Sequence, residues 1–314
     1  MRVLVAGATS VPGLPLLREL NSRGHDVVGL TRQSSKTPQI EQAGAKPVVA
    51  DVFDATEIDA VVADIEPEAV VSLLTTLPKW GPKRPKDFEP ATKLWGRGAP
   101  NLVAAAQRAE VRRIVAESVI FAYGYGSTGP PIMDETDPYP GPPPPGGTEI
   151  LAALRGMEQT VLTSHEHSDT DGIVLRYGVF YGPGVPHDEL FVRLAKWWAL
   201  PALTGNGILS WVHIDDVAKA TADALERGRA GQIYNIVDDR PQSMGDYTRE
   251  LSAKLHRPRP LPLPHRLVGL VASYPATAFG TTWLPLSNAK AKAELGWTPI
   301  MRNPGPGSRP GSGR

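Results

Sequence analysis

The sequence Val-Leu-Val-Ala-Gly-Ala-Thr-Ser-Val-Pro-Gly-Leu at residues 3–14 decides how the fold begins. An apolar run typical of a buried strand ends at Gly7, and a helix is expected to begin near Gly13. Glycine at the first position permits a tight turn, and glycine at the last lets the helix pack closely against the strand. Such a turn presents backbone N–H groups and the positive end of a helix dipole to a phosphate. The stretch therefore predicts a site for the pyrophosphate of a dinucleotide.

The middle position of this turn departs from a Gly-x-x-Gly-x-x-Gly pattern, because Ser10 stands where a third glycine would be. A side chain at this position either crowds the phosphates or hydrogen-bonds to them. The residues predicted to contact the cofactor here are Gly7, Thr9, Ser10, Val11 and Gly13. The alternative is a plain strand–helix turn that binds no ligand.

The residues after the second expected strand indicate which dinucleotide is preferred. An acidic side chain there would bind the ribose 2′-hydroxyl of NAD, whereas an arginine suits the 2′-phosphate of NADP. Leu30 is followed by Thr31-Arg32-Gln33-Ser34-Ser35-Lys36, with no carboxylate. The Arg32 guanidinium can bind a phosphate through two parallel hydrogen bonds. We therefore predict that NADP is preferred over NAD; the alternative is a solvated loop arginine.

Short apolar runs alternate with helical patterns from the first residue onward, which is typical of parallel strands buried on both faces. We therefore predict an α/β fold with a doubly wound parallel sheet. The expected strands are Arg2–Ala6, Asp26–Leu30, Pro47–Ala50, Ala69–Leu74, Arg113–Ala116, Ile173–Arg176, Trp211–Ile214 and Gly231–Val237. The expected helices are Leu14–Ser22, Asn101–Ala109, Ile150–Leu162, Asp215–Arg227 and one near Ser287–Leu295. Asp51 and Val52 follow the third strand and Leu74 ends the fourth, so these residues are predicted to contact the cofactor as well.

Proline and glycine interrupt this pattern in two places. Between Tyr123 and Gly147 lie Pro130, Pro131, Pro138, Pro140 and the run Pro142–Pro145. Proline on this scale excludes a helix or a central strand, so a long surface loop is expected. Residues 303–314 carry no apolar side chain and are expected to be disordered.

The composition of the 314 residues excludes several classes of function. Lys+Arg and Asp+Glu are both 33, and this balance argues against a partner such as nucleic acid or an anionic membrane. The chain has no cysteine, so it has no disulfide, thiolate metal site or cysteine nucleophile. The lack of cysteine fits a reducing, cytoplasmic location. The apolar N-terminus is interrupted too early for a signal peptide, and no apolar run approaches the length of a membrane span.

Six motifs follow one another in a specific order along the chain. They are Gly7-Ala8-Thr9, Ala-Glu-Ser-Val-Ile-Phe-Ala-Tyr-Gly (116–124), Leu-Arg-Tyr-Gly-Val-Phe-Tyr-Gly-Pro-Gly (175–184), Trp-Val-His-Ile-Asp-Asp-Val-Ala (211–218), Tyr-Asn-Ile (234–236) and Leu-Gly-Trp-Thr-Pro (295–299). Together they resemble the extended short-chain dehydrogenases/reductases of the NAD(P)-dependent epimerase/dehydratase type. The resemblance implies a Rossmann domain (1–175 and 211–240) and a smaller substrate-binding part (176–210 and 241–302) with a cleft between them. It also implies that Tyr181, Gly182 and Pro183 lie beside the nicotinamide.

The same resemblance implies a Tyr-x-x-x-Lys pair on one helical face, in which the phenol moves a proton as hydride is transferred. None of the eight tyrosines is followed by lysine four residues later, and alignment of the helix by Glu158 puts Ile150 and Leu154 at the two positions. The usual proton relay is therefore absent. Ser118 lies approximately at the family's serine, and Tyr123 lies just beyond the same strand. Both are predicted to be catalytic, with packing or substrate contact as the alternative for Tyr123.

Three functions are compatible with these features. The first is an NADP-dependent oxidoreductase or sugar-modifying enzyme that acts on a carbonyl or alcohol of a small molecule, with a rearranged proton relay. The second is a non-redox isomerase or cyclase on the same scaffold. The third is a regulator that binds NADP without turnover. The retained cleft motifs favour an enzyme, whereas the missing pair favours the last two functions.

Two other groups of residues have simpler interpretations. No metal site is expected at His213-Ile-Asp-Asp, which we interpret as a strand end and helix start with Asp215 or Asp216 as the cap. Leu194, Trp197 and Trp198 share one face of a helical pattern. Core packing is the default interpretation for them, with a cleft wall or the face of a homodimer as alternatives.

Overall fold

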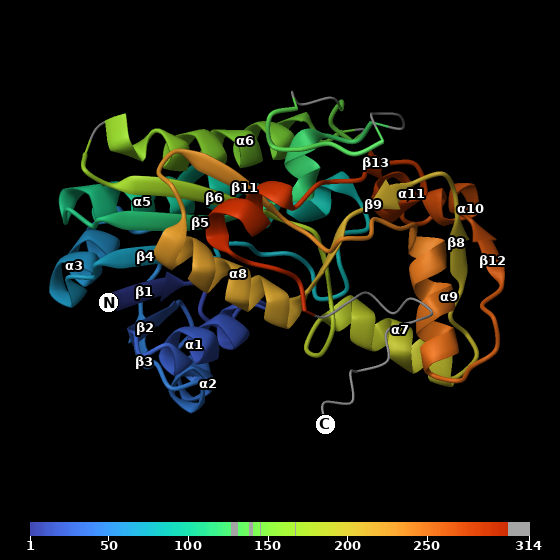
Figure 1. Cartoon of the computed structure of the whole chain (residues 1–314), viewed down its shortest axis with the longest axis horizontal. Helices are drawn as coiled ribbons and strands as arrows, with labels where there is room; N and C mark the ends of the chain where they lie inside the picture. Colours follow the sequence, from blue (N-terminus) through green and yellow to red (C-terminus); the bar gives the residue numbers. More distant parts are fainter. Residues whose placement is uncertain (127–130, 138–140, 145, 167, 301–314) are drawn as a thin grey trace.

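The computed structural model describes residues 1–126, 131–137, 141–144, 146–166 and 168–300 (Figure 1). The predicted disordered tail at 303–314 lies outside these residues. In the described part of the loop between Tyr123 and Gly147, the chain forms no helix after Tyr123 and no strand beyond the single bridge of Met133 to Leu286.

A seven-stranded sheet in the order β11-β6-β5-β4-β1-β2-β3 forms the centre of the molecule, and all of its strand pairs are parallel. Its strands are β1 (Arg2–Ala6), β2 (Asp26–Thr31), β3 (Lys46–Val49), β4 (Ala69–Ser72), β5 (Arg113–Val119), β6 (Asp171–Tyr177) and β11 (Gln232–Ile236). This confirms the predicted doubly wound sheet. Its strand order reverses beside β1, whose neighbours are β2 and β4, and ligands of such sheets bind at this point.

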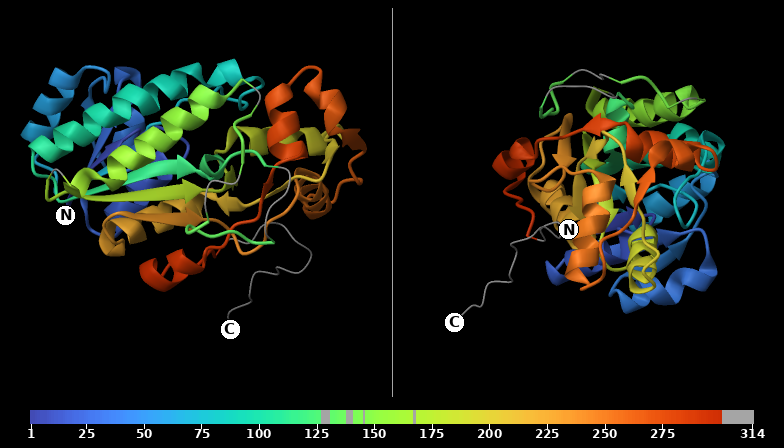
Figure 2. Two further views of the ribbon diagram at one scale, coloured as in Figure 1. Left: turned by 90° about the horizontal axis from the view of Figure 1, so that it is seen from above. Right: turned by 90° about the vertical axis from the view of Figure 1, so that its right-hand side faces the viewer.

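Helices cover both faces of the sheet (Figures 1 and 2). One face carries α1 (Gly13–Ser22), α2 (Thr37–Gln42) and α8 (Ile214–Arg227), and the other carries α3 (Ala55–Ile65), α5 (Ala99–Arg108) and α6 (Thr148–Leu162). Side chains of β1 alternate between the two cores. Val3 and Val5 pack with α1 and α8, whereas Leu4 and Ala6 pack with α3, α5 and α6. This period of two explains why the buried strands read as continuous apolar runs.

A smaller group of elements lies beyond the carboxyl ends of these strands (Figure 1). It contains the pairs β7–β10, β8–β12 and β9–β13 and four helices. The bounds are β7 (Val179–Tyr181), β8 (Ala202–Thr204), β9 (Ile208–Leu209), β10 (Trp211–His213), β12 (Pro262–Pro264), β13 (Trp283–Leu284), α7 (Pro186–Lys196), α9 (Met244–Lys254), α10 (His265–Gly269) and α11 (Ser273–Gly280). The predicted strand at Trp211–Ile214 forms, but it pairs with β7 outside the main sheet. The division into two domains stays a prediction.

Several short helical segments complete the chain. They are α4 (Glu89–Lys93) and the 3₁₀ or π turns η1 (Ser34–Lys36), η2 (Pro85–Phe88), η3 (Leu94–Gly98), η4 (Ile120–Tyr123), η5 (Ser164–Glu166) and η6 (Ala291–Leu295). The helix expected near Ser287–Leu295 forms over residues 289–295, and its last five residues are the π turn η6. Among the described residues, no helix is both long and apolar enough to span a bilayer.

Two tryptophans after α7 depart from the default interpretation. Trp197 and Trp198 are 78% and 72% exposed, so core packing is wrong for both. Helix α7 ends at Lys196, and Trp198 has a backbone φ of 60°, which turns the chain away from the helix. The cleft-wall and dimer-face alternatives stay predictions.

A buried ion pair joins α6 to β6. Arg176 donates to Glu158 through Nε (2.9 Å) and Nη2 (2.7 Å), and both side chains are almost fully buried. The removal of one partner of such a pair leaves an uncompensated charge in the core. The pair therefore fixes α6 against the sheet.

We expect Glu158→Gln to lower the free energy of unfolding by about 3–5 kcal/mol, since Arg176 would then lack its carboxylate. The double variant Glu158→Leu/Arg176→Met should recover much of this loss, because no unpaired charge remains. Urea unfolding followed by circular dichroism measures both values. A loss below about 1 kcal/mol in the single variant would contradict this role.

Candidate cofactor-binding site

The turn after β1 has backbone geometry that only glycine tolerates at two positions. Gly7 has a φ of +81°, and a Cβ atom added there would lie 2.3 Å from the carbonyl oxygen of Leu73, just past β4. A Cβ atom added at Gly13 would lie 2.5 Å from the carbonyl oxygen of Ala8. The first glycine thus lets the turn approach β4, and the second lets α1 start against the turn.

Ser10 lies inside this turn with an unsatisfied hydroxyl group. Its N–H donates to the Gly7 carbonyl oxygen (2.9 Å), and its own carbonyl accepts from the Gly13 N–H (3.1 Å). Its Oγ atom is buried and has no hydrogen-bond partner among the described residues. A buried hydroxyl without a partner is costly, and a phosphate oxygen would satisfy it.

The first turn of α1 offers few backbone donors to an anion. The Gly13 N–H is already bonded to Ser10, and Pro15 has no N–H. The serine hydroxyl therefore adds a donor where the helix start lacks them. This fits the interpretation in which Ser10 hydrogen-bonds to the phosphates.

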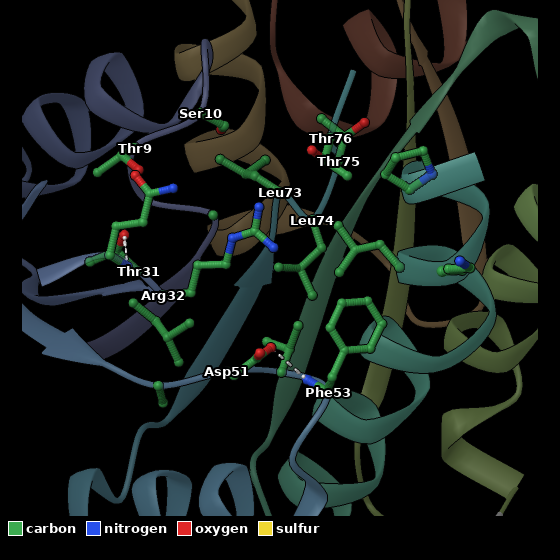
Figure 3. Close-up of a pocket in the computed structure, with 18 of the residues that line it drawn as sticks. Thr9, Ser10, Thr31, Arg32, Asp51, Phe53, Leu73, Leu74, Thr75 and Thr76 are labelled. Atoms are coloured by element: carbon green, nitrogen blue, oxygen red, sulfur yellow. Dashed lines mark hydrogen bonds between the residues drawn. The ribbon is translucent and has the colours of Figure 1, made fainter. Parts of the chain in front are cut away.

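A cavity of about 500 Å³ lies beside this turn, at the carboxyl ends of β1, β2, β3 and β4 (Figure 3). Seven of the predicted cofactor contacts line it: Gly7, Thr9, Ser10, Arg32, Asp51, Val52 and Leu74. Val11, Gly13, Tyr181, Gly182, Pro183, Ser118 and Tyr123 are not among its lining residues. The size suits part of a dinucleotide, since ligand pockets range from about 300 to 1,000 Å³.

The charged side chains around this cavity are mixed in sign. Figure 3 shows the Arg32 side chain extending over the cavity from the end of β2, and Lys36 of η1 lines the same side. The Asp51 carboxylate accepts from the Phe53 N–H (3.0 Å), which fixes the turn after β3. Lys93 also lines the cavity but is paired with Glu89 (2.7 Å). Lys36 is absent from the predicted site, although its position in the same polar loop as Arg32 is a usable signal.

The structure places the two predicted catalytic residues in a buried network. Ser118 donates through Oγ to Glu158 (2.5 Å), the partner of Arg176. Tyr123 is fully buried, and its hydroxyl shares one hydrogen between the Asn235 side-chain oxygen (3.1 Å) and the Asp134 carbonyl oxygen (3.0 Å). The Arg176 guanidinium lies over the Tyr123 ring at 4.5 Å.

The burial and contacts of Tyr123 are compatible with the packing role that was its alternative. Burial raises the pKa of the Tyr123 phenol, which is opposite to the shift that a proton-transferring tyrosine needs near neutral pH. Ile150 and Leu154, which are predicted to stand at the positions of the family pair, are both buried in the apolar core under α6. Catalysis by Ser118 and Tyr123 stays a prediction.

The predicted nicotinamide loop is held by a separate polar cluster. Tyr181 donates to Asp238 (2.8 Å), and the Gly182 N–H donates to Asp188 (2.9 Å), which also accepts from Tyr247. Contact of Tyr181, Gly182 and Pro183 with a cofactor stays a prediction.

The cap of α8 in the same region differs from the expected one. His213 is the cap, because its Nδ1 accepts the Asp215 N–H (3.2 Å). Asp216 instead accepts from the Ile300 N–H. Among the described residues, no three His, Cys, Asp or Glu side chains are grouped in a way that could hold a metal ion.

Glu117 of β5 is an ionisable residue that the sequence analysis did not single out. It is 7% exposed, and its Oε2 atom has no hydrogen-bond partner among the described residues. Burial raises the pKa of the Glu117 carboxyl to about 8. An acidic residue inside the apolar run Arg-Ile-Val-Ala-Glu-Ser-Val was the available signal.

This carboxyl makes the stability of the protein depend on pH. Because its folded-state pKa is raised, the native state holds the proton more tightly than the unfolded chain, whose pKa is near 4.5. The stabilisation is complete below about pH 4.5 and is lost as the pH rises to about 8, at about 1.4 kcal/mol per unit.

We expect Glu117→Gln to match the wild type within about 1 kcal/mol near pH 5 and to exceed it by roughly 2–4 kcal/mol at pH 8. Urea unfolding at several pH values measures the difference. Glu41→Gln, which alters an exposed carboxylate on α2, is the control and should show no such divergence. Parallel pH profiles for the wild type and Glu117→Gln would show that Glu117 is ionised in the folded protein.

Comparisons with known proteins agree with the fold. The model of the NAD dependent epimerase/dehydratase family matches residues 3–237. A 3-diazoavenalumate denitrifying reductase of Streptomyces sp is 36% identical over 325 aligned residues, which cover all of both chains. The chain therefore belongs to the NAD-dependent epimerase/dehydratase family.

Solved structures show the same fold at lower sequence identity. UDP-glucose 4-epimerase of Thermotoga maritima, determined with UDP-glucose, superposes with a TM-score of 0.78 at 21% identity, covering 97% of this chain and 95% of that one. The Thermus thermophilus UDP-glucose 4-epimerase, in complex with NAD, gives 0.78 at 22% identity, covering 97% and 96%.

Proposed function

We propose that this protein is an NADPH-dependent reductase whose substrate accepts hydride without needing a proton from a tyrosine–lysine pair. Two observations together support this proposal. A cavity lies beside the turn after β1, and Ile150 and Leu154, at the predicted positions of the tyrosine–lysine pair, are apolar and buried. Hydride transfer is favoured over isomerisation and over regulation without turnover, because the relative matched over its whole length is named a reductase.

The chain's own residues would hold the cofactor in three regions. Gly7, Thr9, Ser10, Val11 and Gly13 would receive the pyrophosphate, with the Ser10 hydroxyl as a donor. Asp51, Val52 and Leu74 would enclose the adenosine, while Arg32 and Lys36 would bind the 2′-phosphate. Tyr181, Gly182 and Pro183 would lie at the nicotinamide end. Bound NADPH would supply two electrons as hydride.

We expect Arg32→Ala to weaken NADPH binding by about 1–3 kcal/mol and to leave NADH binding nearly unchanged, because it removes a charge-assisted hydrogen bond to the 2′-phosphate. Fluorescence titration with both cofactors measures this. Arg112→Ala changes an exposed arginine that precedes β5, at the opposite end of the strand from the cavity, and serves as the matched control. Equal weakening of NADPH and NADH would contradict the assignment of Arg32.

The missing proton relay restricts the substrate. Reduction of a carbonyl leaves an alkoxide oxygen that must be protonated, whereas replacement of an aryl diazonium group by hydride forms one C–H bond and releases N₂ with the C–N electron pair. The second reaction gives a neutral arene and consumes no proton. The name of the Streptomyces relative specifies a diazo group, its loss, and a carboxylate. A diazo-bearing aromatic acid is therefore the substrate class that we favour over a carbonyl compound or nucleotide sugar.

We expect the protein to oxidise NADPH in the presence of a diazotised aminobenzoate, with N₂ release and one deuterium from a single 4-deuterated NADPH diastereomer at the carbon that carried nitrogen. Mass spectrometry of the arene measures the label, and a reaction without protein gives the background. A panel of ketones, aldehydes and UDP-glucose should react far more slowly. Cofactor binding with no turnover of any of these compounds would favour the regulator instead.

A further inference from the structure

The strand register places Glu117 in the same row across the sheet as Gly7, which begins the turn after β1. Ala6 pairs with Ser72 and Ser72 with Ala116, so the next row across the sheet contains Gly7, Leu73 and Glu117. The close approach of Gly7 to the Leu73 carbonyl confirms the first part of this row. Neighbouring strands are about 4.8 Å apart, which puts Glu117 about 10 Å from Gly7 along the carboxyl edge of the sheet.

The Glu117 side chain points to the face of the sheet that α1 and α8 cover. Val115 and Tyr177 of the same face belong to the core formed with these helices, whereas Ser118 and Arg176 point to α6 on the opposite face. The Glu158–Arg176 pair is therefore not available to Glu117. Within the described part of the chain, no charged group shifts the pKa of the Glu117 carboxyl, which burial raises.

The titratable groups around Glu117 are few. Tyr177 on β6 interacts with it, and the Tyr177 hydroxyl is hydrogen-bonded to Thr221 of α8 (2.7 Å). On α1, Glu19 is paired with Arg23. At the start of α8, His213 interacts with Asp215, and the Asp216 carboxylate accepts from Ile300. No cation on these packed elements neutralises Glu117.

The direction of the cofactor follows from the proposed function, on which this inference rests. Arg32 and Lys36, which are proposed to bind the 2′-phosphate, follow β2, and the turn proposed to bind the pyrophosphate follows β1. The cavity continues to Leu73–Thr76 after β4. The next strand edge in this direction is β5. A dinucleotide that enters at β2 therefore brings its nicotinamide end toward Glu117.

We propose that Glu117 is the counter-charge of the nicotinamide ring: its carboxyl is protonated beside the neutral ring of NADPH and ionises beside the positively charged ring of NADP⁺. The proton leaves to solvent when NADP⁺ binds, so charge and atoms balance. A buried carboxyl without a cationic partner is stable only in its neutral form. A cation brought next to it reverses that preference, and the unpartnered Oε2 atom is free to respond.

Binding measurements at several pH values test this inference without turnover. The free carboxyl is protonated below about pH 8, so NADP⁺ must displace the proton there, and its affinity should rise with pH up to that value. We expect the ratio of the NADP⁺ and NADPH dissociation constants to fall about tenfold per pH unit between about pH 6.5 and 7.5. The 2′-phosphate titrates in both cofactors, so the ratio isolates the ring.

Calorimetry of the wild-type protein in two buffers with different ionisation enthalpies supplies a second measurement. We expect NADP⁺ binding near pH 7 to release about one proton more than NADPH binding. Glu117→Gln should abolish this difference and make the ratio of dissociation constants independent of pH. Glu250→Gln, which alters another carboxyl with a raised pKa on the remote helix α9, should retain both effects.

The possible results of these binding experiments distinguish the counter-charge role of Glu117 from the proposed function. A ratio that does not change with pH in the wild type, or a pH dependence that persists in Glu117→Gln, overturns the counter-charge role while leaving the proposed reductase intact. No saturable binding of either cofactor overturns the proposed function and this inference with it.

Discussion

The close approach of the first turn to β4 is the constraint on which the site depends. Gly7 lies against the Leu73 carbonyl so tightly that any larger side chain would collide with backbone, and backbone cannot yield as a flexible side chain can. Gly7 and Leu73 both line the cavity, at the point where the strand order reverses. The ends of β2, β3 and β4 then supply the walls around one crevice.

Polar groups at this crevice compensate for one another. Prolines at the start of α1 reduce the number of backbone donors, and the Ser10 hydroxyl adds one. Ser118 and Tyr123, the two predicted catalytic residues, belong to a buried network with Glu158 and Arg176. The buried Glu158–Arg176 ion pair and the Ser118–Glu158 hydrogen bond thus hold α6 against β5 and β6.

The central sheet and the turn after β1 could be predicted from the sequence, because each depends on a pattern within a short stretch of chain. Apolar runs identify strands buried on both faces, and Gly7 and Gly13 identify the turn. Seven predicted contacts meet in one cavity because all follow strand ends that share the same edge. Long-range features were harder to predict. The exposure of Trp197 and Trp198 depends on where α7 ends, and the isolation of Glu117 depends on which face of β5 each residue takes relative to Arg176.

The burial of Ile150 and Leu154 has a consequence for any attempt to install a proton relay on α6. Both side chains are part of the packed core between α6 and the sheet, at 8% and 2% exposure. A lysine introduced in place of Leu154 would carry its ammonium group into this apolar core. A lysine at position 154 would therefore require repacking of the core between α6 and the sheet as well as the substitution itself.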